Sequence, residues 1–406
     1  KLNTTGAYNN AFGYQALNDN TTGNYNAAFG SQALASNTTA SNNTAVGYQS
    51  LYANTTGTSN TAVGRQAGDA NTTGSSNSIF GDGAYTTGTT GANNTAIGKS
   101  ALALNTTASN NTAVGYQAGY SSTTGSSNTA VGRKALYANT TGHSNSALGA
   151  DLPGVVAGSA LGANTTGLRN SAFGGSALAT NTTGSENTAV GGAALFSNTT
   201  ASNNTAVGYQ AGLSNTTAND NVTVGMDAFY NGTTGSDNVL IGHRAGYNHS
   251  SGSNNVGIGY DALLQNTTAS SNTAVGYQAG LSNTTGTRIS AFGRKSLSSN
   301  TTGNYNTGLG YYALQANTTA SYNTAIGHDT MKSLVGGGAT NNTAVGASAM
   351  NATTTGANNS GFGASAINSN TTGANNTALG NSALFSNTTA SNNTAVGYRA
   401  SYSSTT

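Results

Sequence analysis

The stretch that decides the fold is residues 43–57, which read Asn43-Thr44-Ala45-Val46-Gly47-Tyr48-Gln49-Ser50-Leu51-Tyr52-Ala53-Asn54-Thr55-Thr56-Gly57. After two linker residues the pattern begins again at Asn60. The glycine that follows the short apolar run, here Gly47, occurs in 23 copies, and 20 of the 22 intervals between these anchor glycines equal the spacing from Gly47 to Gly64. Self-similarity at one fixed period is the sequence signature of a repeat architecture.

Two interruptions break the period. The interval from Gly149 to Gly174 is longer than the others by eight, and the interval from Gly327 to Gly346 is longer by two. We predict one continuous solenoid domain with the following parts: regular coils at 1–149, 174–327 and 346–406, a coil with an eight-residue loop insertion at 150–173, and a coil with a two-residue insertion at 328–345. Insertions in repeat proteins often lie on the binding face, which makes these two the candidates for a specialised surface, although drift in a tolerant loop is the interpretation that we favour.

The repeat unit predicts an all-β fold. It is too short for a pair of helices, helical periodicity is absent, and its residues indicate strand, turn, strand, turn. Asn occupies the position four before the anchor in 22 of 23 copies, and Asn-Thr-Thr marks the other corner 17 times; both are typical of turns. We therefore expect a parallel β-solenoid (β-roll) of about 23 coils with a 17-residue repeat, stacked at roughly 4.8 Å per coil.

The apolar positions predict which side of the strand faces the core. The residue before the anchor is apolar in every copy, from Phe12 to Val396, so we expect this pre-anchor column to point inward. The residue two before the anchor is usually alanine, and neighbouring strand residues face opposite sides. A narrow coil buries little surface, so we expect this alanine column to pack against partner chains around a threefold axis. The alternative is a monomeric, flattened solenoid with all apolar columns in one core.

Composition excludes several classes of function. Charged residues make up 5% of the 406 residues, the net charge is +2, and there is no cysteine. Nucleic-acid binding needs clustered Lys and Arg, and a membrane helix needs about 20 apolar residues in a row, so neither partner is expected. The absence of cysteine excludes disulfides and thiolate metal sites.

Catalytic and metal chemistry have little support in the sequence. His243 and His249 lie close together, but no third ligand recurs beside them. Asp220 and Asp237 are one repeat apart and could stack across coils, where a bound cation is conceivable and separation in solvent is the alternative. Serines occur without a paired His and Asp. We expect no enzyme activity and no cofactor.

Two surface columns are candidate sites. A tyrosine directly follows the anchor in eight copies, where it could contact glycans or pack across coils: Tyr14, Tyr48, Tyr116, Tyr209, Tyr260, Tyr277, Tyr311 and Tyr398. The Asn-Thr-Thr corners are glycosylation sequons wherever that machinery exists, and turn chemistry is the alternative; the candidates are Asn54, Asn105, Asn139, Asn198, Asn266, Asn317 and Asn387. Thr arrays also suggest ice binding, although adjacent Thr55 and Thr56 would point to opposite sides.

The runs Asn43-Thr44-Ala45-Val46-Gly47 and Asn94-Thr95-Ala96-Ile97-Gly98 resemble the head repeats of trimeric autotransporter adhesins. The longer unit is similar to arrays in bacterial and phage tail-fibre-like proteins. The resemblance covers essentially the whole chain and implies a left-handed, homotrimeric β-roll, although the adhesin repeat is shorter than the repeat of this chain. It implies a location outside the cell, at the cell surface, or in a virion tail fibre.

These observations predict a structural fibre segment, a stiff spacer or filament with a possible adhesive role toward surfaces or glycans. Both ends of the sequence fall at the same phase of the repeat, so we expect a segment of a longer protein or a subunit joined end to end. The alternatives are a monomeric Thr/Asn-ladder solenoid that binds ice or cations, and a phage tail-fibre shaft for host recognition.

Overall fold

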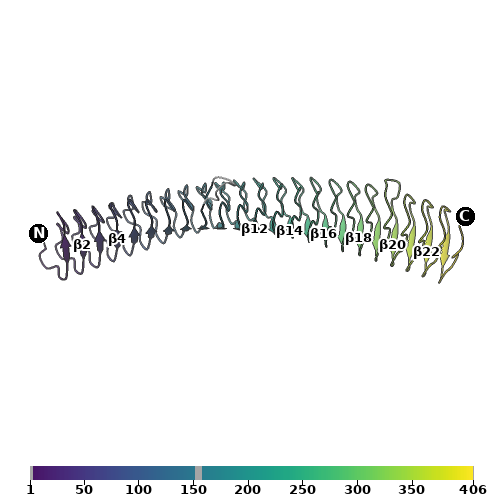
Figure 1. The fold of residues 1–406 in the computed structure, drawn as a ribbon, viewed down its shortest axis with the longest axis horizontal. Coiled ribbons are helices and arrows are strands. Elements are labelled where there is room, and N and C mark those ends of the chain that lie inside the picture. The colour runs from purple at the N-terminus through teal and green to yellow at the C-terminus, as the bar shows by residue number, and fades with distance from the viewer. Residues whose placement is uncertain (1–2, 151–157, 406) are drawn as a thin grey trace. The chain divides into compact units, whose positions relative to one another are not determined.

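The structure is a computed structural model that describes residues 3–150 and 158–405. It is all-β, a parallel β-solenoid of about 22 to 23 coils with a 17-residue repeat (Figure 1). The chain divides into two units, Lys1–Asn203 and Asn204–Thr406, and each is described by itself.

Unit 1 contains one three-residue strand per coil. These strands are β1 (Asn10–Phe12), β2 (Ala27–Phe29), β3 (Thr44–Val46), β4 (Thr61–Val63), β5 (Ser78–Phe80), β6 (Thr95–Ile97), β7 (Thr112–Val114), β8 (Thr129–Val131), β9 (Ser146–Leu148), β10 (Ser171–Phe173) and β11 (Thr188–Val190). Consecutive strands pair in parallel, with Thr44 opposite Thr61 as an example. Across the longer interval Ser146 still lies opposite Ser171, so the insertion leaves the strand register unchanged. Most of the predicted eight-residue loop, residues 151–157, lies outside the described residues.

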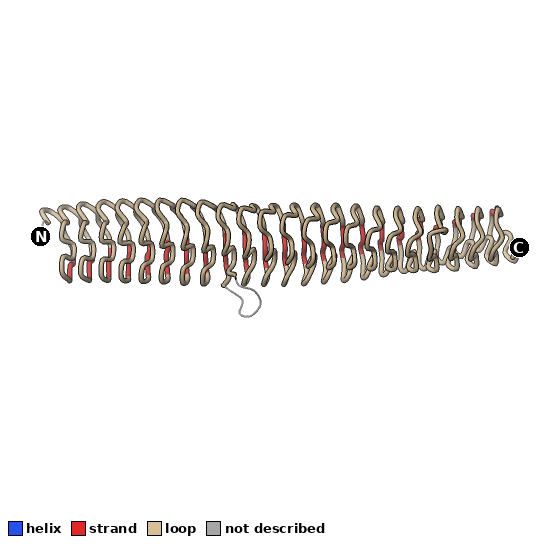
Figure 2. Tube along the Cα trace, turned by 90° about the horizontal axis from the view of Figure 1, so that it is seen from above, coloured by secondary structure: helices blue, strands red, loops and turns tan. Residues whose placement is uncertain are grey.

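Unit 2 repeats the same arrangement. Its strands are β12 (Thr205–Val207), β13 (Val222–Val224), β14 (Val239–Ile241), β15 (Val256–Ile258), β16 (Thr273–Val275), β17 (Ser290–Phe292), β18 (Thr307–Leu309), β19 (Thr324–Ile326), β20 (Thr343–Val345), β21 (Ser360–Phe362), β22 (Thr377–Leu379) and β23 (Thr394–Val396). At the second interruption Thr324 pairs with Thr343, so the two extra residues lie between strands that stay in register. Within each unit the strands recur on the same side of successive coils (Figure 2).

The rest of each coil consists of turns, and the prediction of a second strand is wrong. The residues two and four after the anchor adopt left-handed backbone conformations, with φ of 55° at Gln49 and 49° at Leu51. A strand needs extended φ angles, so these two positions interrupt it. The need for left-handed φ also accounts for the alternation of Leu and Gly four after the anchor, because glycine adopts this conformation without strain.

The anchor glycine is required by the distance between coils. Gly98 has a φ of +129°, and a Cβ there would lie 2.5 Å from the carbonyl oxygen of Gly115 in the next coil. The recurrence of glycine at this position therefore has a steric cause, because a Cβ would collide with the backbone of the next coil at a φ that only glycine adopts without strain.

The core is formed by alanines from the strand side and by leucines from the opposite side. Ala45 and Leu51 are both fully buried, whereas Val46 is 36% exposed. The predicted orientation of the strand is thus wrong: the alanine column points into the coil, and the pre-anchor column points outward. The prediction that the alanine column packs against partner chains falls with it.

The narrowness of the coil explains this orientation. The central strand residue can be large only where the facing residue, four after the anchor, is glycine. Ile79 points inward in this way beside Gly68, where a Cβ would lie 2.7 Å from the Ile79 Cδ1 atom. In unit 2, Leu240 likewise fills the space beside Gly246, where a Cβ would lie 2.7 Å from its Cδ1 atom. Elsewhere the leucine occupies the interior, and only alanine fits opposite it.

Two ladders of asparagine side chains join successive coils. The Asn54 Nδ2 atom donates to Asn37 Oδ1 at 3.1 Å and to the Gly57 carbonyl at 2.9 Å. The Asn43 Nδ2 atom donates to the same carbonyl at 2.9 Å, and Asn43 Oδ1 accepts from the backbone amide of Asn60 at 2.9 Å. The Asn residues at both corners therefore satisfy buried backbone groups between coils as well as within a turn.

Among residues 3–150 and 158–405 the structure contains no helix with the length and apolar character to cross a membrane.

Candidate functional site

The tyrosines that follow the anchor lie on the outer surface. Tyr48, Tyr116 and Tyr209 are 48%, 43% and 45% exposed, and Tyr14 and Tyr398, near the ends of the sequence, are more exposed. Each projects from the turn that begins at the anchor glycine, one residue beyond the strand. We call this set of positions the post-anchor column.

In unit 2 the post-anchor column forms a ladder of flat side chains over six consecutive coils. The ring centroids of His243 and Tyr260 are 5.0 Å apart, and those of Tyr260 and Tyr277 are 5.4 Å apart. The guanidinium of Arg294 then lies between two rings, 5.6 Å from the Tyr277 centroid and 5.4 Å from that of Tyr311. The ring centroids of Tyr311 and His328 are 5.0 Å apart, and His328 is the last residue of the ladder.

This ladder limits how its rings can contact a sugar. Tyr260, Tyr277 and Tyr311 each have a face covered by a neighbouring ring or guanidinium, so stacking within the ladder competes with stacking on a pyranose. Within the described part of the chain, Tyr48, Tyr116 and Tyr209 stack on no other aromatic ring. The structure therefore separates the eight candidate tyrosines into stacked and unstacked sets.

An ion pair lies beside the ladder, between Arg244 and Asp261, the residues that directly follow His243 and Tyr260 in the sequence. The Arg244 NH2 atom is 2.8 Å from Asp261 Oδ1, and the Asp261 side chain is only 4% exposed. Burial opposes the charge of Arg244, but Asp261 and Tyr260 outweigh it and raise the pKa of Arg244. The pair connects adjacent coils and leaves the Asp261 charge neutralised.

The second insertion adds charged contacts at the end of the ladder. Asp329 lies 3.2 Å from the Lys332 Nζ atom and 3.3 Å from His328 Nδ1, and Lys332 lies over the Tyr312 ring at 4.8 Å. Met331 and Leu334 are fully buried, so this segment packs into the core of its coil. Its exposed residues are Val335, Gly337 and Gly338.

The seven candidate sequon asparagines occupy the buried corner ladder. Each is 0% exposed; these are Asn54, Asn105, Asn139, Asn198, Asn266, Asn317 and Asn387. The first Thr of the corner donates its hydroxyl hydrogen to the next coil, as Thr55 Oγ1 does to the Thr72 carbonyl at 3.1 Å. A glycan on any of these amides would require the side chain to leave the ladder, and only the second Thr, such as Thr56, is exposed.

Tyr85, which the repeat pattern did not mark as a site residue, takes the place of a missing corner asparagine. At Gly88 the corner Asn is absent, and the Tyr85 hydroxyl reaches the site, where it donates to the Gly91 carbonyl at 3.2 Å and accepts from Asn94 Nδ2 at 3.2 Å. Burial raises the pKa of Tyr85 to about 12. The signal was available, since the aromatic residue and the glycine depart from the repeat consensus in the same coil.

His249 occupies the asparagine position of another coil and is 0% exposed. Its Nε2 atom lies 2.6 Å from the Gly252 carbonyl, and its Nδ1 atom lies 2.8 Å from Asn266 Nδ2. Nε2–H therefore donates and Nδ1 accepts, which assigns a neutral ring. Burial lowers the pKa of His249, although the contact with Gly252 opposes this shift.

The other predicted chemical candidates lie apart or on the surface. His243 belongs to the post-anchor ladder, whereas His249 is buried in the core. Asp220 and Asp237 are exposed, one repeat apart. Over the residues the structure describes, no group of three His, Cys, Asp or Glu side chains is placed to hold a metal ion.

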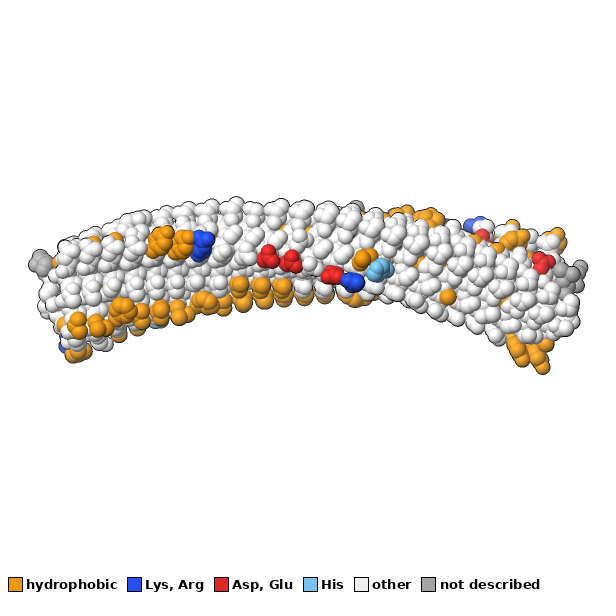
Figure 3. Space-filling view, turned by 180° about the vertical axis from the view of Figure 1, so that it is seen from behind, with side chains coloured by type: hydrophobic (Ala, Val, Ile, Leu, Met, Phe, Trp, Pro, Cys, Tyr) orange, Lys and Arg blue, Asp and Glu red, His pale blue; other side chains and the backbone are white. Residues whose placement is uncertain are grey.

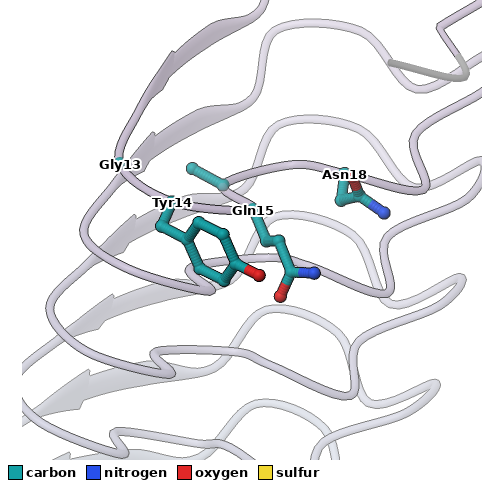
Figure 4. Close-up of a pocket in the computed structure, with 5 residues that line it drawn as sticks. Gly13, Tyr14, Gln15 and Asn18 are labelled. Atoms are coloured by element: carbon teal, nitrogen blue, oxygen red, sulfur yellow. The ribbon is translucent and has the colours of Figure 1, made fainter.

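A shallow hollow lies on the first coil of unit 1, and it is lined by Gly13, Tyr14, Gln15, Ala16 and Asn18 (Figure 4). Its lining contains no charged group. The Gln15 amide oxygen accepts from Gln32 Nε2 at 3.0 Å, so part of its polar lining is already engaged.

No protein-family model matches the chain, and a search of curated proteins finds no match.

Proposed function

We propose that the chain is a non-catalytic, structural segment of an extracellular fibre, a stiff spacer or filament. The observation that carries this proposal is the network that joins neighbouring coils within each unit. Backbone bonds such as Thr55 N to Thr72 O at 2.9 Å are reinforced by the Asn and Thr side-chain ladders. Because each coil contacts only its neighbours, stacking produces length and few recessed surfaces.

The surface supports the same role. The hollow described above is lined by uncharged residues, and in residues 3–150 and 158–405 the turns between strands bond to the next coil, as Ala53 N does to the Asp69 carbonyl at 2.8 Å. Short, bonded loops resist proteolysis, because a protease needs a locally unfolded segment. As part of the same proposal, the chain is located outside the cell, at the cell surface or in a virion tail fibre.

Limited proteolysis and negative-stain microscopy test the structural role. We expect elongated particles and slow cleavage within residues 158–405 under conditions that digest a matched Ala274→Asp variant. Ala274 is 0% exposed, so the substitution buries an unpaired charge in the core. Compact particles, or cleavage of the unmodified chain as fast as that of the variant, would contradict the proposal.

A second candidate is adhesion to glycans through the unstacked tyrosines Tyr48, Tyr116 and Tyr209, which are partly exposed to solvent. Amphipathic rings of this kind contact sugars with little loss of conformational entropy. On a glycan array, the triple alanine variant of these residues should lose binding, while Tyr120→Ala, in a stacked pair with Tyr137, should retain it. Equal binding by both variants would exclude the unstacked tyrosines as the contact.

A further inference from the structure

The positive charges of the chain are unevenly distributed, and several lie where the post-anchor ladder ends. The sequence after Asp261 holds five of the twelve Lys and Arg residues but only one of the ten acidic residues, Asp329. Charged side chains are sparse on the face of the molecule shown in Figure 3, where groups that are neither charged nor hydrophobic cover most of the surface. A local excess of positive charge therefore distinguishes this part of unit 2.

Three of these cations lie beside two tyrosines, at the turns that follow β17, β18 and β19. The Arg294 NH1 atom donates to the hydroxyl oxygen of Tyr311 at 2.7 Å and to that of Tyr312 at 3.5 Å. The Lys332 Nζ atom lies 4.8 Å from the centre of the Tyr312 ring, and Lys295 directly follows Arg294 in the chain. We call Arg294, Lys295, Tyr311, Tyr312 and Lys332 the cationic cluster.

The cationic cluster produces a positive potential at the Tyr312 hydroxyl. The hydrogen bond with Tyr311 is the largest influence and lowers the pKa of Tyr312. Burial opposes this shift, and the positive charges of the three cations in the cluster lower the pKa further. A lowered phenol pKa means that the surroundings stabilise a negative charge, so the same cations would stabilise an anionic group of a ligand.

Most of the positive charge of the cluster is not neutralised within the chain. Lys332 pairs with Asp329 at 3.2 Å, but in residues 3–150 and 158–405 neither Arg294 nor Lys295 forms an ion pair. Cation–π contacts hold the Arg294 guanidinium against neighbouring rings and leave its charge in place. Arg294 is exposed and Lys295 is partly exposed, so a ligand can reach both side chains.

Two kinds of polyanion fit the cluster poorly. Single-stranded nucleic acids stack their bases on open aromatic faces, but Tyr311 has the Arg294 guanidinium and the His328 ring as its neighbours in the ladder. An anionic membrane surface attracts groups of about four to eight Lys and Arg residues, which is more than the cluster contains.

A polysaccharide with acidic groups fits the spacing and the surroundings of the cluster. Its charges are separated along the chain by sugar hydroxyls, and Lys295 and Lys332 lie two coils apart, roughly 10 Å at about 4.8 Å per coil. Gln315 is partly exposed and precedes Lys332 by one repeat. Its amide and the tyrosine hydroxyls are groups that can hydrogen-bond sugar hydroxyls between the charges.

We propose that the cationic cluster binds a polysaccharide that carries sulfate or carboxylate groups. Arg294, Lys295 and Lys332 pair with the acidic groups, and the tyrosine hydroxyls contact the sugar. This inference goes beyond the structural role. It is also independent of the unstacked tyrosines, because the contact depends on charge and hydrogen bonds and does not need an open ring face.

The test is the retention of the full chain on immobilised heparin, a sulfated polysaccharide, during a gradient of sodium chloride. The variant Arg294→Tyr/Lys295→Gln removes two charges and restores the Tyr-Gln pair of the repeat consensus, so the ladder keeps a flat side chain at this position. Since each exposed charge contact contributes little, we expect about tenfold weaker binding, elution at lower salt and an unchanged thermal melt.

The matched control is Arg133→Tyr/Lys134→Gln. It changes an identical Gly-Arg-Lys sequence in unit 1, where Arg133 is exposed and Lys134 is partly exposed as in the cluster. This control removes the same net charge and should elute with the unmodified chain. An equal shift in the control and in the cluster variant would show that net charge alone attracts heparin, and would overturn the site. Unchanged retention of the cluster variant, or no retention of the unmodified chain, would overturn it too.

Competition with soluble polymers identifies the partner. Dextran sulfate or polygalacturonate should release the unmodified chain from heparin, which assigns the acidic group as sulfate or carboxylate, whereas uncharged dextran should not. Release by dextran would contradict a charge-based contact. Release by single-stranded DNA or polyglutamate at equal or lower concentration would assign the cluster to another class of partner and overturn the proposal. The structural role is tested separately, by particle shape and proteolysis.

Discussion

At the residue scale, the repeat tolerates substitution where another side chain supplies the same hydrogen bonds. His249 and Tyr85 both replace a buried Asn amide and bond the corner carbonyl, at Gly252 and Gly91 respectively. The sequence shows the departures from the consensus, but not their geometry, because the replacement comes from the same position in one case and from three residues earlier in the other.

The buried imidazole of His249 predicts a pH dependence of stability. Because its folded pKa is lowered, the unfolded chain binds the proton more readily once the pH falls below about 6.5. The contribution of the neutral His249 ring to the free energy of unfolding is therefore fully present above about pH 6.5. It is lost as the pH falls toward the pKa of His249 in the folded chain. Thermal melts from pH 7.5 to 5 should show a smaller fall in midpoint for His249→Asn, which restores the consensus residue.

The control for this measurement is His143→Asn, because His143 is exposed. It should melt with the same pH profile as the unmodified chain. An identical profile for His249→Asn would show that the buried ring does not link protonation to folding.

Removal of the Tyr85 hydroxyl should lower the stability of the fold slightly. Tyr85→Phe removes the hydroxyl but leaves the Gly91 carbonyl with its bond from Asn77 Nδ2 at 2.9 Å. We expect a loss of about 1 kcal/mol in the free energy of unfolding, measured by denaturant titration. Tyr120→Phe, in a stacked surface pair, should cost less; an equal cost would argue that the hydroxyl of Tyr85 makes no specific contribution.

At the scale of the element, the period, the position of each strand and the anchor glycine were predictable from the sequence. The direction of the strand was not. The alternation of side chains along a strand defines two faces, but it does not show which face points inward. Size alone favours the large pre-anchor residue for the core, and this expectation is wrong. The deciding fact is that Leu51 enters the same interior with a left-handed φ of 49°, which leaves room only for Ala45.

The anchor glycine predicts a strong local effect of adding one methyl group. Gly98→Ala would place its Cβ 2.5 Å from a backbone oxygen at a φ of +129°, so we expect a loss of about 1–3 kcal/mol or more. The matched control is Gly336→Ala, where a Cβ would meet nothing within 4 Å. Comparable melting temperatures for the two variants would contradict the close coil approach.

At the scale of the whole molecule, one chain satisfies its backbone but not its apolar surface. Each unit joins its coils through buried amide and hydroxyl ladders, while the pre-anchor column stays partly exposed along both units. The small core predicts a shared interior, and the alternation of the strand assigned that role to the alanine column. The structure buries the alanine column inside each coil and exposes the pre-anchor column instead, because the side that a three-residue strand turns inward depends on what fills the coil opposite it.

The most direct test of the account measures that direction with cysteine accessibility, since the chain contains no cysteine of its own. Single Ala291→Cys and Phe292→Cys variants are compared by maleimide labelling before and after unfolding. Ala291 is fully buried and Phe292 is 37% exposed. The account predicts rapid labelling at position 292 and protection at position 291 until the chain unfolds. Protection at 292 with rapid labelling at 291 would contradict it.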